Sequence, residues 1–380
     1  MPDRKDATVQ ADMTRVLIVT DGLQNGGAER QLALLAASLP EPWSASVLSM
    51  EDGPYRRVLE DSGVDVSLAP RRFRYDVSAA ARMWHAAARS KPDVVHCWGW
   101  MSTLAMAPYC RLNKVPLLNG TIQVGRLPAG RLGMFRLALS VSDAIVANSR
   151  AGLTAFGLSE GGRNSFVYNG FDASRLSAIA ADIGEPEPHE GMVAIMAARM
   201  FPAKDWHLLL EVARVLARDS AAWTFVAMGD GPSRTRLLEE AADLIGAGVI
   251  TFPPGELEAL PAIARADVGV LFTDPDAHAA EGISNTIMEY MACGLPVVCT
   301  DSGGNPELVE DGVTGFLTIP KDVDATVRAM RTLCSDRERA REMGREGRRR
   351  LQERFSVEIM TSCFIAIYES LLADRRRVRP

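Results

Sequence analysis

The chain contains 380 residues with a formal net charge of -6, and 47% of its residues are hydrophobic while 24% are charged. This length exceeds what one ordinary hydrophobic core holds, so it predicts two domains, and the composition is that of a globular enzyme. Six cysteines without CxxC spacing exclude a disulfide scaffold and predict reduced core thiols. The start is polar and no apolar run has the length of a membrane span, so we expect a cytoplasmic protein.

The charge is unevenly distributed along the chain. Residues 1–180 carry 20 Lys and Arg against 16 Asp and Glu, whereas the remainder carries 22 against 32. We therefore expect the first half to be the part that meets an anionic partner.

The first predicted unit consists of a strand at 15–20, a turn at Gly26 and Gly27, and a helix at 28–39. This is a βα unit of the doubly wound kind, but its glycines lack the G-x-G-x-x-G spacing of dinucleotide-binding enzymes. Glycine is needed where backbone approaches a ligand closely, because a Cβ would hold the ligand off. A plain turn is the alternative role for this pair.

Strands and helices then alternate, which predicts a parallel sheet with helices on both faces. We expect strands at 46–50, 64–68, 93–97, 117–120, 144–148 and 165–168, and helices near 55–61 and 79–89. The strand at 93–97 places His96 and Trp98 at the carboxyl edge of the sheet, where open α/β sheets bind ligands. The alternatives are a core histidine bonded to backbone and a tryptophan used for packing.

Two basic groups mark the first half: Arg71, Arg72 and Arg74, and then Arg126, Arg131 and Arg136. The second group alternates with apolar side chains, so it could contact anionic lipid or a phosphate-bearing acceptor. A solvated helix face is the alternative.

The second domain opens with a strand at 192–197, followed by a loop that carries Arg199 and Lys204. A strand that ends at Gly229 comes next, and another runs from 268 to 273. The Asp274-x-Asp276 pair after that strand has the spacing of a metal-binding D-x-D motif, but an acidic loop produces such a match easily by chance.

The stretch from Glu281 to Gly304 is predicted to be the centre of the site. A helix that Ser284 or Asn285 caps should run to Met291 and stop at 294, followed by a buried strand at 296–300. The start of such a helix offers unpaired N–H groups and partial positive charge, which favour phosphate.

Glu281 and Glu289, with seven residues between them, are followed by MACGLPVV and a Gly-Gly turn, and this run resembles the donor site of the retaining GT-B glycosyltransferases of family 4. GGAE at 26–29, ANSR at 147–150, YNGFD at 168–172, AARMFPAKD at 197–205, GDGP at 229–232 and GGNPELVEDGVTGFL at 303–317 also resemble that family. The resemblance covers nearly the whole chain.

The resemblance implies an α/β GT-B fold with two Rossmann-like, doubly wound domains that face each other across a cleft. It implies an acceptor-binding domain at 1–182, a linker at 183–191, a nucleotide-sugar-binding domain at 192–355, and a helix at 356–380 that crosses back. We expect the helix at 356–372 to pack through apolar residues such as Ile359 and Cys363, and the basic tail at 375–379 to be disordered.

The resemblance also implies retaining transfer of a sugar from a nucleoside diphosphate sugar, with UDP as the expected nucleotide. Arg199 and Lys204 would hold the diphosphate, because fixed cations stabilise the charge that forms when the bond to the sugar breaks. They would do so without a metal or a cofactor.

The remaining roles follow from the same resemblance. Glu289 would accept from the ribose hydroxyls and Glu281 from the sugar hydroxyls. Backbone at Gly26, Gly27, Gly229, Gly282, Ile283, Ser284 and Asn285 would approach the donor. Family members often show a His-x-His pair where this chain has His96 and Trp98, and this departure argues against a role for His96 as a general base. If the departing phosphate itself takes the acceptor's proton, His96 has only a positioning role.

The acceptor would be a glycan, a lipid-linked saccharide or a small molecule held by the first domain, as in polysaccharide biosynthesis, with peripheral contact to anionic membrane. The segment at 336–355 mixes both charge signs, which indicates a solvated helix and no nucleic-acid partner. The alternatives are a donor-binding subunit without its own turnover and a GT-B-shaped epimerase or phosphorylase.

Overall fold

The computed structural model describes residues 13–24, 26–72, 76–123, 132–183, 191–218, 223–255, 258–274 and 281–377. The chain forms two compact units. Unit 1 comprises Met1–Thr121, Met134–Ile145 and Phe364–Pro380, and unit 2 comprises Ile122–Gly133 and Val146–Cys363. None of the helices in the described part is long and apolar enough to cross a membrane.

The first sheet has seven strands in the order β3-β2-β1-β4-β5-β6-β7. The strands are β1 Thr14–Thr20, β2 Trp43–Ser49, β3 Asp65–Leu68, β4 Val94–Cys97, β5 Leu117–Ile122, β6 Ala144–Ala147 and β7 Asn164–Phe166. β1 pairs in parallel with β2 on one side and with β4 on the other, so the strand order reverses between β1 and β4. The predicted alternation of strands and helices is confirmed.

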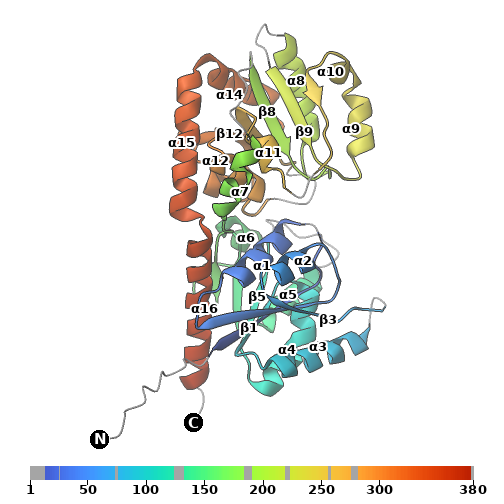
Figure 1. Ribbon diagram of the computed structural model, residues 1–380, viewed down its shortest axis with the longest axis vertical. Helices are drawn as coiled ribbons and strands as arrows, with labels where there is room; N and C mark the ends of the chain where they lie inside the picture. Colours follow the sequence, from blue (N-terminus) through green and yellow to red (C-terminus); the bar gives the residue numbers. More distant parts are fainter. Residues whose placement is uncertain are drawn as a thin grey trace, which may run out of the picture. The chain divides into compact units, whose positions relative to one another are not determined.

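The helices that connect these strands are visible in Figure 1 as the blue to green segments. They are α1 Gly27–Ser38, α2 Tyr55–Asp61, α3 Val77–Ser90, α4 Trp100–Asn113, α5 Leu132–Ser140 and α6 Arg150–Ala155. The next helix, α7 Ser174–Ile183, follows the last strand of this sheet and lies in unit 2. The sequence did not predict α4, whose first residue is Trp100. The predicted linker at 183–191 lies mostly outside the described residues.

The second sheet has six strands in the order β10-β9-β8-β11-β12-β13, so it repeats the reversal between its first and fourth strands. The strands are β8 Met192–Ala197, β9 Trp223–Met228, β10 Ile250–Thr251, β11 Val268–Leu271, β12 Val297–Thr300 and β13 Gly315–Thr318. β11 pairs in parallel with β8 and β12. In open α/β sheets, ligands bind at the carboxyl ends of the strands beside such a reversal.

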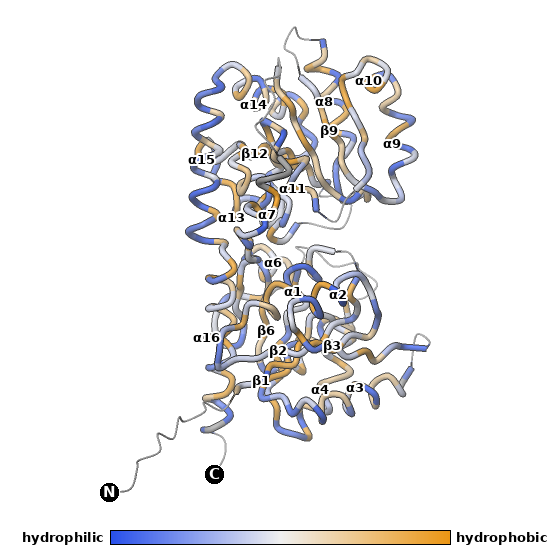
Figure 2. Tube along the Cα trace, viewed as in Figure 1, coloured by the Kyte–Doolittle hydropathy of each residue, from blue (hydrophilic) through white to orange (hydrophobic). Residues whose placement is uncertain are grey.

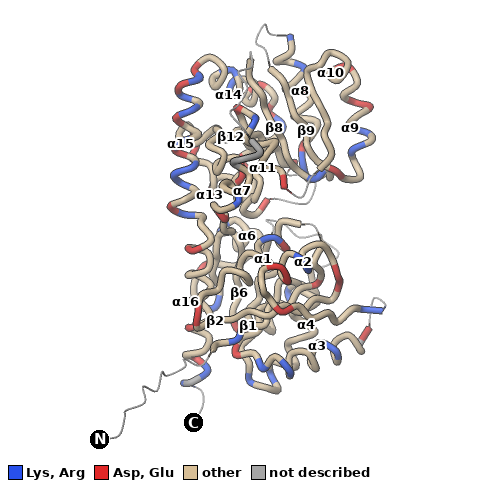
Figure 3. The backbone as a smooth tube through the Cα atoms, viewed as in Figure 1, with Lys and Arg blue, Asp and Glu red and all other residues tan. Residues whose placement is uncertain are grey.

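The helices of the second half surround that sheet and bury one continuous apolar core. They are α8 Trp206–Arg218, α9 Arg234–Glu240, α10 Ala242–Gly246, α11 Leu260–Ile263, α12 Asn285–Ala292, α13 Asn305–Leu308, α14 Val323–Ser335 and α15 Arg337–Arg354. The last helix, α16 Val357–Arg377, belongs to unit 1 from Phe364 onward. Along α15, hydrophilic residues predominate in Figure 2 and both charge signs alternate in Figure 3, as the sequence predicted for a solvated helix.

The last helix differs from its prediction in two ways. α16 continues to Arg377, so part of the tail predicted to be disordered is helical. The predicted contact face is also wrong, because Ile359 is 37% exposed and Cys363 is exposed, whereas Phe364 and Tyr368 are buried. Apolar residues occupy more than one face of this helix, so spacing alone did not identify the buried face.

The backbone of α15 packs closely against the turn that follows α12, and this contact predicts the effect of a substitution at Gly344. A Cβ at Gly344 would lie 1.8 Å from the Gly294 carbonyl oxygen, so Gly344→Ala should lower the free energy of unfolding. We expect a loss of about 1 to 3 kcal/mol by overpacking, measured by denaturant unfolding.

Gly347, on the same helix, is the matched control. A Cβ there would meet its nearest neighbour at 3.6 Å, an ordinary contact. Gly347→Ala should be neutral, or should raise stability by up to about 1 kcal/mol because alanine favours a helix. Equal losses in both variants would contradict the packing described for Gly344.

Candidate functional site

Two loops meet at the strand reversal of the second sheet, one after β8 and one after β11. The first loop is fixed to the second by backbone hydrogen bonds, from Asp205 N–H to the Phe272 carbonyl at 3.0 Å and from Asp274 N–H to the Ala203 carbonyl at 3.1 Å. Lys204 also forms an isolated β-bridge with Thr273. The backbone of the predicted cation loop is therefore held against the end of β11.

The side chains of this corner bring together two of the predicted donor residues. The Lys204 ammonium forms an ion pair with the Glu281 carboxylate, and these side chains are 16% and 22% exposed. Arg199 lies in the same loop, with its guanidinium carbon 4.4 Å from the centre of the Phe201 ring. Such stacking fixes the plane of the guanidinium while its N–H groups remain available to an anion.

Gly229 supports the same loop from the end of β9. Its φ is +154°, and a Cβ there would lie 1.9 Å from the Ala198 carbonyl oxygen, immediately before Arg199. Glycine is therefore required for the approach of the cation loop to β9, and this contact explains its position without a ligand. The predicted approach of Gly229 to the nucleotide stays a prediction.

The helix α12 begins as the sequence predicted. Ser284 is the N-cap, and its side chain accepts a hydrogen bond from the Ile287 N–H at 3.4 Å. Gly294 has φ +73° just after the helix, and β12 follows at Val297–Thr300. The positive end of the α12 dipole is thus directed to the carboxyl edge of the sheet, where it favours an anion.

A Gly-Gly turn packs beneath the backbone that leads into α12. A Cβ at Gly303 would lie 2.1 Å from the Glu281 carbonyl oxygen, and one at Gly304 would lie 2.4 Å from the Gly282 carbonyl oxygen. The Gly304 N–H donates to the Glu281 carbonyl at 3.0 Å. This turn fixes the backbone on which Glu281 and Gly282 lie.

Glu289 lies in α12 and is almost completely buried, with a residue exposure of 4%. The Arg175 guanidinium, from α7, donates to its carboxylate at 2.8 Å. The same guanidinium contacts both carboxylate oxygens of Glu258 at 2.8 and 3.1 Å. A buried carboxylate requires such a partner, because desolvation of an uncompensated charge is costly.

Asn169 is a second partner of the α12 region that the sequence did not place in the site. Its side-chain amide donates to the Ile283 carbonyl at 2.9 Å and to the Asn285 side-chain oxygen at 3.2 Å. Asn169 and Arg175 lie in and just after the YNGFD segment, so this segment supports the predicted donor site. The only signal in the sequence was the likeness of YNGFD to a family landmark.

His96 lies in unit 1 and has no solvent exposure. Its Nδ1 lies 2.8 Å from the Tyr368 hydroxyl, and its ring packs against Phe364 with ring centres 5.1 Å apart. Burial lowers the pKa of His96 to about 3, so the imidazole is neutral at physiological pH. A Cβ at position 120 would lie 2.7 Å from His96 Nε2, so glycine is required there.

The other predicted groups are spread over the chain. Gly26 is the N-cap of α1 and Gly27 its first residue, both in unit 1. Trp98 is 8% exposed. Of the basic groups, Arg71, Arg72 and Arg136 are described, while residues 74, 126 and 131 lie outside the described part.

The residues that the structure describes include no cluster of three or more His, Cys, Asp or Glu side chains that could hold a metal ion. Asp274 forms an ion pair with Lys321 at 3.2 Å, and residue 276 lies outside the described part. Within unit 2, the structure thus gathers the cation loop, the start of α12 and the Glu281 ion pair at one sheet edge.

Two family models match the chain in succession. The model for glycosyltransferase family 4 matches residues 25–175, and the model for glycosyl transferases group 1 matches residues 181–350. The chain belongs to glycosyltransferase family 4. It is a glycosyltransferase of the hexosyltransferase class, as the motif at 281–317 predicted.

Relatives of this glycosyltransferase include named enzymes of two bacteria. It is 27% identical over 354 residues to the lipopolysaccharide core biosynthesis glycosyltransferase LpsE of Rhizobium meliloti, a match that covers 91% of this chain and 97% of LpsE. It is 36% identical over 160 residues to a GDP-mannose-dependent phosphatidylinositol monomannoside mannosyltransferase of Mycolicibacterium smegmatis, covering 41% of this chain and 42% of that enzyme.

Solved structures establish the GT-B fold of the glycosyltransferase. HepE of Anabaena, solved with UDP, superposes with a TM-score of 0.79 at 22% identity over 94% of this chain and 100% of HepE. The galactosyltransferase WaaB gives a TM-score of 0.71 at 15% identity, covering 94% and 99% of the two chains. The predicted fold class is confirmed.

The buried contact between Arg175 and Glu289 predicts a large coupling in stability. Arg175→Met removes a charge partner from the buried Glu289, so we expect a loss of about 3 kcal/mol in the free energy of unfolding. The double variant with Glu289→Gln should recover part of that loss, as a double-mutant cycle would measure. Additive losses would show that the two side chains do not interact.

Arg56→Met is the matched control for that cycle. Arg56 contacts Glu60 at 2.8 Å, but both side chains are well exposed, at 40% and 45%. Solvent screens such a pair, so its removal should lower the free energy of unfolding far less than Arg175→Met does.

Burial of His96 predicts a pH dependence of stability. Because its pKa is lowered in the folded protein, protons bind the unfolded chain preferentially between the unfolded value of 6.5 and about 3. Stability contributed by neutral His96 is therefore complete above pH 6.5 and lost as the pH falls. At pH 5 the loss should be roughly 2 kcal/mol relative to pH 8.

His96→Gln isolates that contribution, because glutamine does not titrate. The melting temperature of the wild type, relative to that of the variant, should be lower at pH 5 than at pH 8. A difference that does not change with pH would show that His96 is accessible to protons in the folded state.

Proposed function

We propose that this enzyme transfers a sugar from a nucleoside diphosphate sugar, with UDP as the nucleotide, to an acceptor with retention at the anomeric carbon. The observation that carries the proposal is the Lys204–Glu281 ion pair at the strand reversal of the second sheet, between Arg199 and the start of α12. A diphosphate and a hydroxyl-bearing sugar require this combination of cation, helix N-terminus and carboxylate.

Arg199 and Lys204 would hold the donor diphosphate. When a donor binds, its phosphate oxygens would attract the Lys204 ammonium away from Glu281, and the freed carboxylate would accept hydrogen bonds from the sugar hydroxyls. The nucleoside diphosphate gains charge as the bond to the sugar breaks. Two fixed cations near that charge stabilise the transition state without requiring a metal or a cofactor.

The amides at Gly282, Ile283, Ser284 and Asn285 would contact a phosphate, in line with the direction of the α12 dipole. Glu289 would accept from both ribose hydroxyls, since a carboxylate can pair with a diol. Arg175 and Glu258 would hold Glu289 in place for that contact.

Gly26, Gly27 and His96 complete the proposed set from unit 1. The glycine pair begins α1, where a helix N-terminus and a missing Cβ would allow the donor to approach backbone. His96 is buried and neutral, so we assign it a positioning role through Tyr368.

The choice of UDP rests on the sequence resemblance and on one structural relative. HepE has been solved with UDP and with UDP-glucose, whereas the M. smegmatis relative is named for GDP-mannose. UDP-glucose and GDP-mannose are both nucleoside diphosphate sugars, which supports the donor class proposed for this chain.

We propose a glycan or a lipid-linked saccharide as acceptor, held by the first domain at residues 1–182, with the donor held by residues 192–355. LpsE is named for lipopolysaccharide core biosynthesis, which supports an acceptor of this kind. Such an acceptor agrees with a cytoplasmic enzyme that makes peripheral contact with anionic membrane through basic residues of the first domain, such as Arg71 and Arg72.

A donor panel tests this proposal directly. Purified protein would be titrated with UDP-, GDP- and ADP-sugars, and the shift in melting temperature measured with and without EDTA. UDP-sugars should stabilise the wild type regardless of EDTA, by binding linkage. Lys204→Ala and Glu289→Ala should lose most of that shift, and Arg56→Met should keep it.

Three outcomes would contradict parts of the proposal. Stabilisation by GDP- or ADP-sugars alone would overturn the choice of nucleotide. Loss of the shift on addition of EDTA would overturn the metal-free site. Binding without release of nucleoside diphosphate in the presence of a glycan acceptor panel would favour a subunit that binds donor without turnover.

A further inference from the structure

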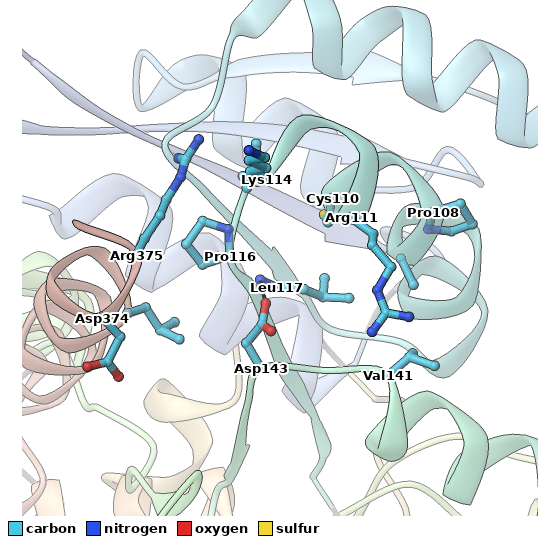
Figure 4. A pocket seen from close by; sticks show the side chains of 13 residues that line it. Pro108, Cys110, Arg111, Lys114, Pro116, Leu117, Val141, Asp143, Asp374 and Arg375 are labelled. Carbon is cyan, nitrogen blue, oxygen red and sulfur yellow. Dashed lines mark hydrogen bonds between the residues drawn. The ribbon is translucent and has the colours of Figure 1, made fainter. Parts of the chain in front are cut away.

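A cavity of about 830 Å³ lies in unit 1, at the amino ends of β5 and β6. Figure 4 shows its walls, which come from the end of α4, the residues before β5, the turn before β6 and the last turns of α16. Of the proposed donor residues, Gly26 and Gly27 lie in unit 1 at the start of α1, and the others lie in unit 2. His96 lies near the opposite, carboxyl end of its strand. The cavity is large enough for a small organic ligand.

Three cations line this cavity: Arg111, Lys114 and Arg375. Within the described part of the chain, none of them forms an ion pair with an acidic side chain. Arg375 donates to the Asn113 carbonyl at 3.5 Å, and its Nε is buried without a hydrogen-bond partner in that part. No acidic side chain in the described part takes up the charge of Arg375, so its guanidinium is suited to an anionic acceptor.

The acidic residues at the cavity do not neutralise these cations. The Asp143 carboxylate accepts a hydrogen bond from the Leu117 N–H at 2.8 Å, so it is used to hold the start of β5. Asp374 is exposed, and in Figure 4 its carboxylate points away from Arg375 and Lys114. Arg375 and Arg111 stand on opposite sides of the cavity in that view.

The rest of the lining is mainly apolar, with Val115, Pro116, Val141 and Leu371 among its residues. A ligand that fits both features combines an anionic group with an apolar chain, because such a chain gains free energy by leaving water.

We propose that this cavity binds an amphiphile in which a phosphate group is joined to an apolar chain. The phosphate accepts hydrogen bonds from the Arg375 guanidinium and the Lys114 ammonium. Arg375 reaches the carbonyl of Asn113, the residue before Lys114. The chain lies along the apolar lining. This site is separate from the proposed donor site and does not depend on the nucleotide.

Isothermal titration of the full-length protein tests the site with three soluble probes at low salt. Short-chain phosphatidic acid should bind, whereas phosphatidylcholine of equal chain length and inorganic phosphate should bind at least about tenfold more weakly. R375Q combined with K114Q should weaken binding of the phosphatidic acid about tenfold or more, because charge-assisted hydrogen bonds are lost.

R377Q is the matched control, because Arg377 is an exposed arginine near Arg375 on the same helix and does not line the cavity. The affinity of R377Q for phosphatidic acid should stay within about twofold of the wild-type value, since an exposed charge contributes little to binding. Equal melting temperatures of all variants would verify that they fold. Flotation with vesicles that contain phosphatidic acid separates two sources of the ligand. If the ligand is a membrane lipid, the protein should float with these vesicles. If it is a free metabolite, the protein should not.

Three results would overturn the proposal. One is the absence of binding at millimolar phosphatidic acid. Another is equal binding of phosphatidylcholine, which would remove the role of the cations. The last is binding of inorganic phosphate as tight as that of the lipid, which would leave an adventitious anion site without the apolar part.

Discussion

The ion pair between Lys204 and Glu281 joins the two loops on which the proposed donor site depends. Each loop follows a strand beside the reversal in the second sheet, and backbone hydrogen bonds hold the loops together there. Each of the two charges satisfies the other in a largely buried corner. In the proposed function, a donor with phosphate and hydroxyls would replace this pair at both ends, which would link binding to the alignment of the carboxylate.

In the proposed function, the helix α12 extends this arrangement from the diphosphate to the nucleoside. Its first turn lies beside Glu281, and its second turn carries the buried Glu289. Arg175 and Asn169 reach this helix from the segment around YNGFD, so residues more than a hundred positions away hold both ends of the proposed nucleotide contact. The charged groups are thus positioned by residues that need not touch a ligand themselves.

Local signals in the sequence were sufficient to predict the backbone of the proposed donor site around α12. The cap at Ser284, the stop at Gly294 and the strand after it are properties of short segments, and the structure reproduces them. The contact between Arg175 and Glu289 spans 114 positions, and no periodicity reports such a distance. The prediction of the buried face of α16 was wrong for a related reason. Packing partners, and not the spacing of apolar residues, decide which of several apolar faces is buried.

Binding of the nucleoside diphosphate product by Glu281→Gln and Lys204→Ala, measured by titration calorimetry, tests the central claim most directly. Because Glu281 competes with the diphosphate for Lys204, Glu281→Gln should bind the product at least as tightly as wild type and still lose transfer. Lys204→Ala should bind it about tenfold or more weakly. If Glu281→Gln weakened product binding as much as Lys204→Ala does, the ion pair would be a structural contact and not the pair that the donor replaces.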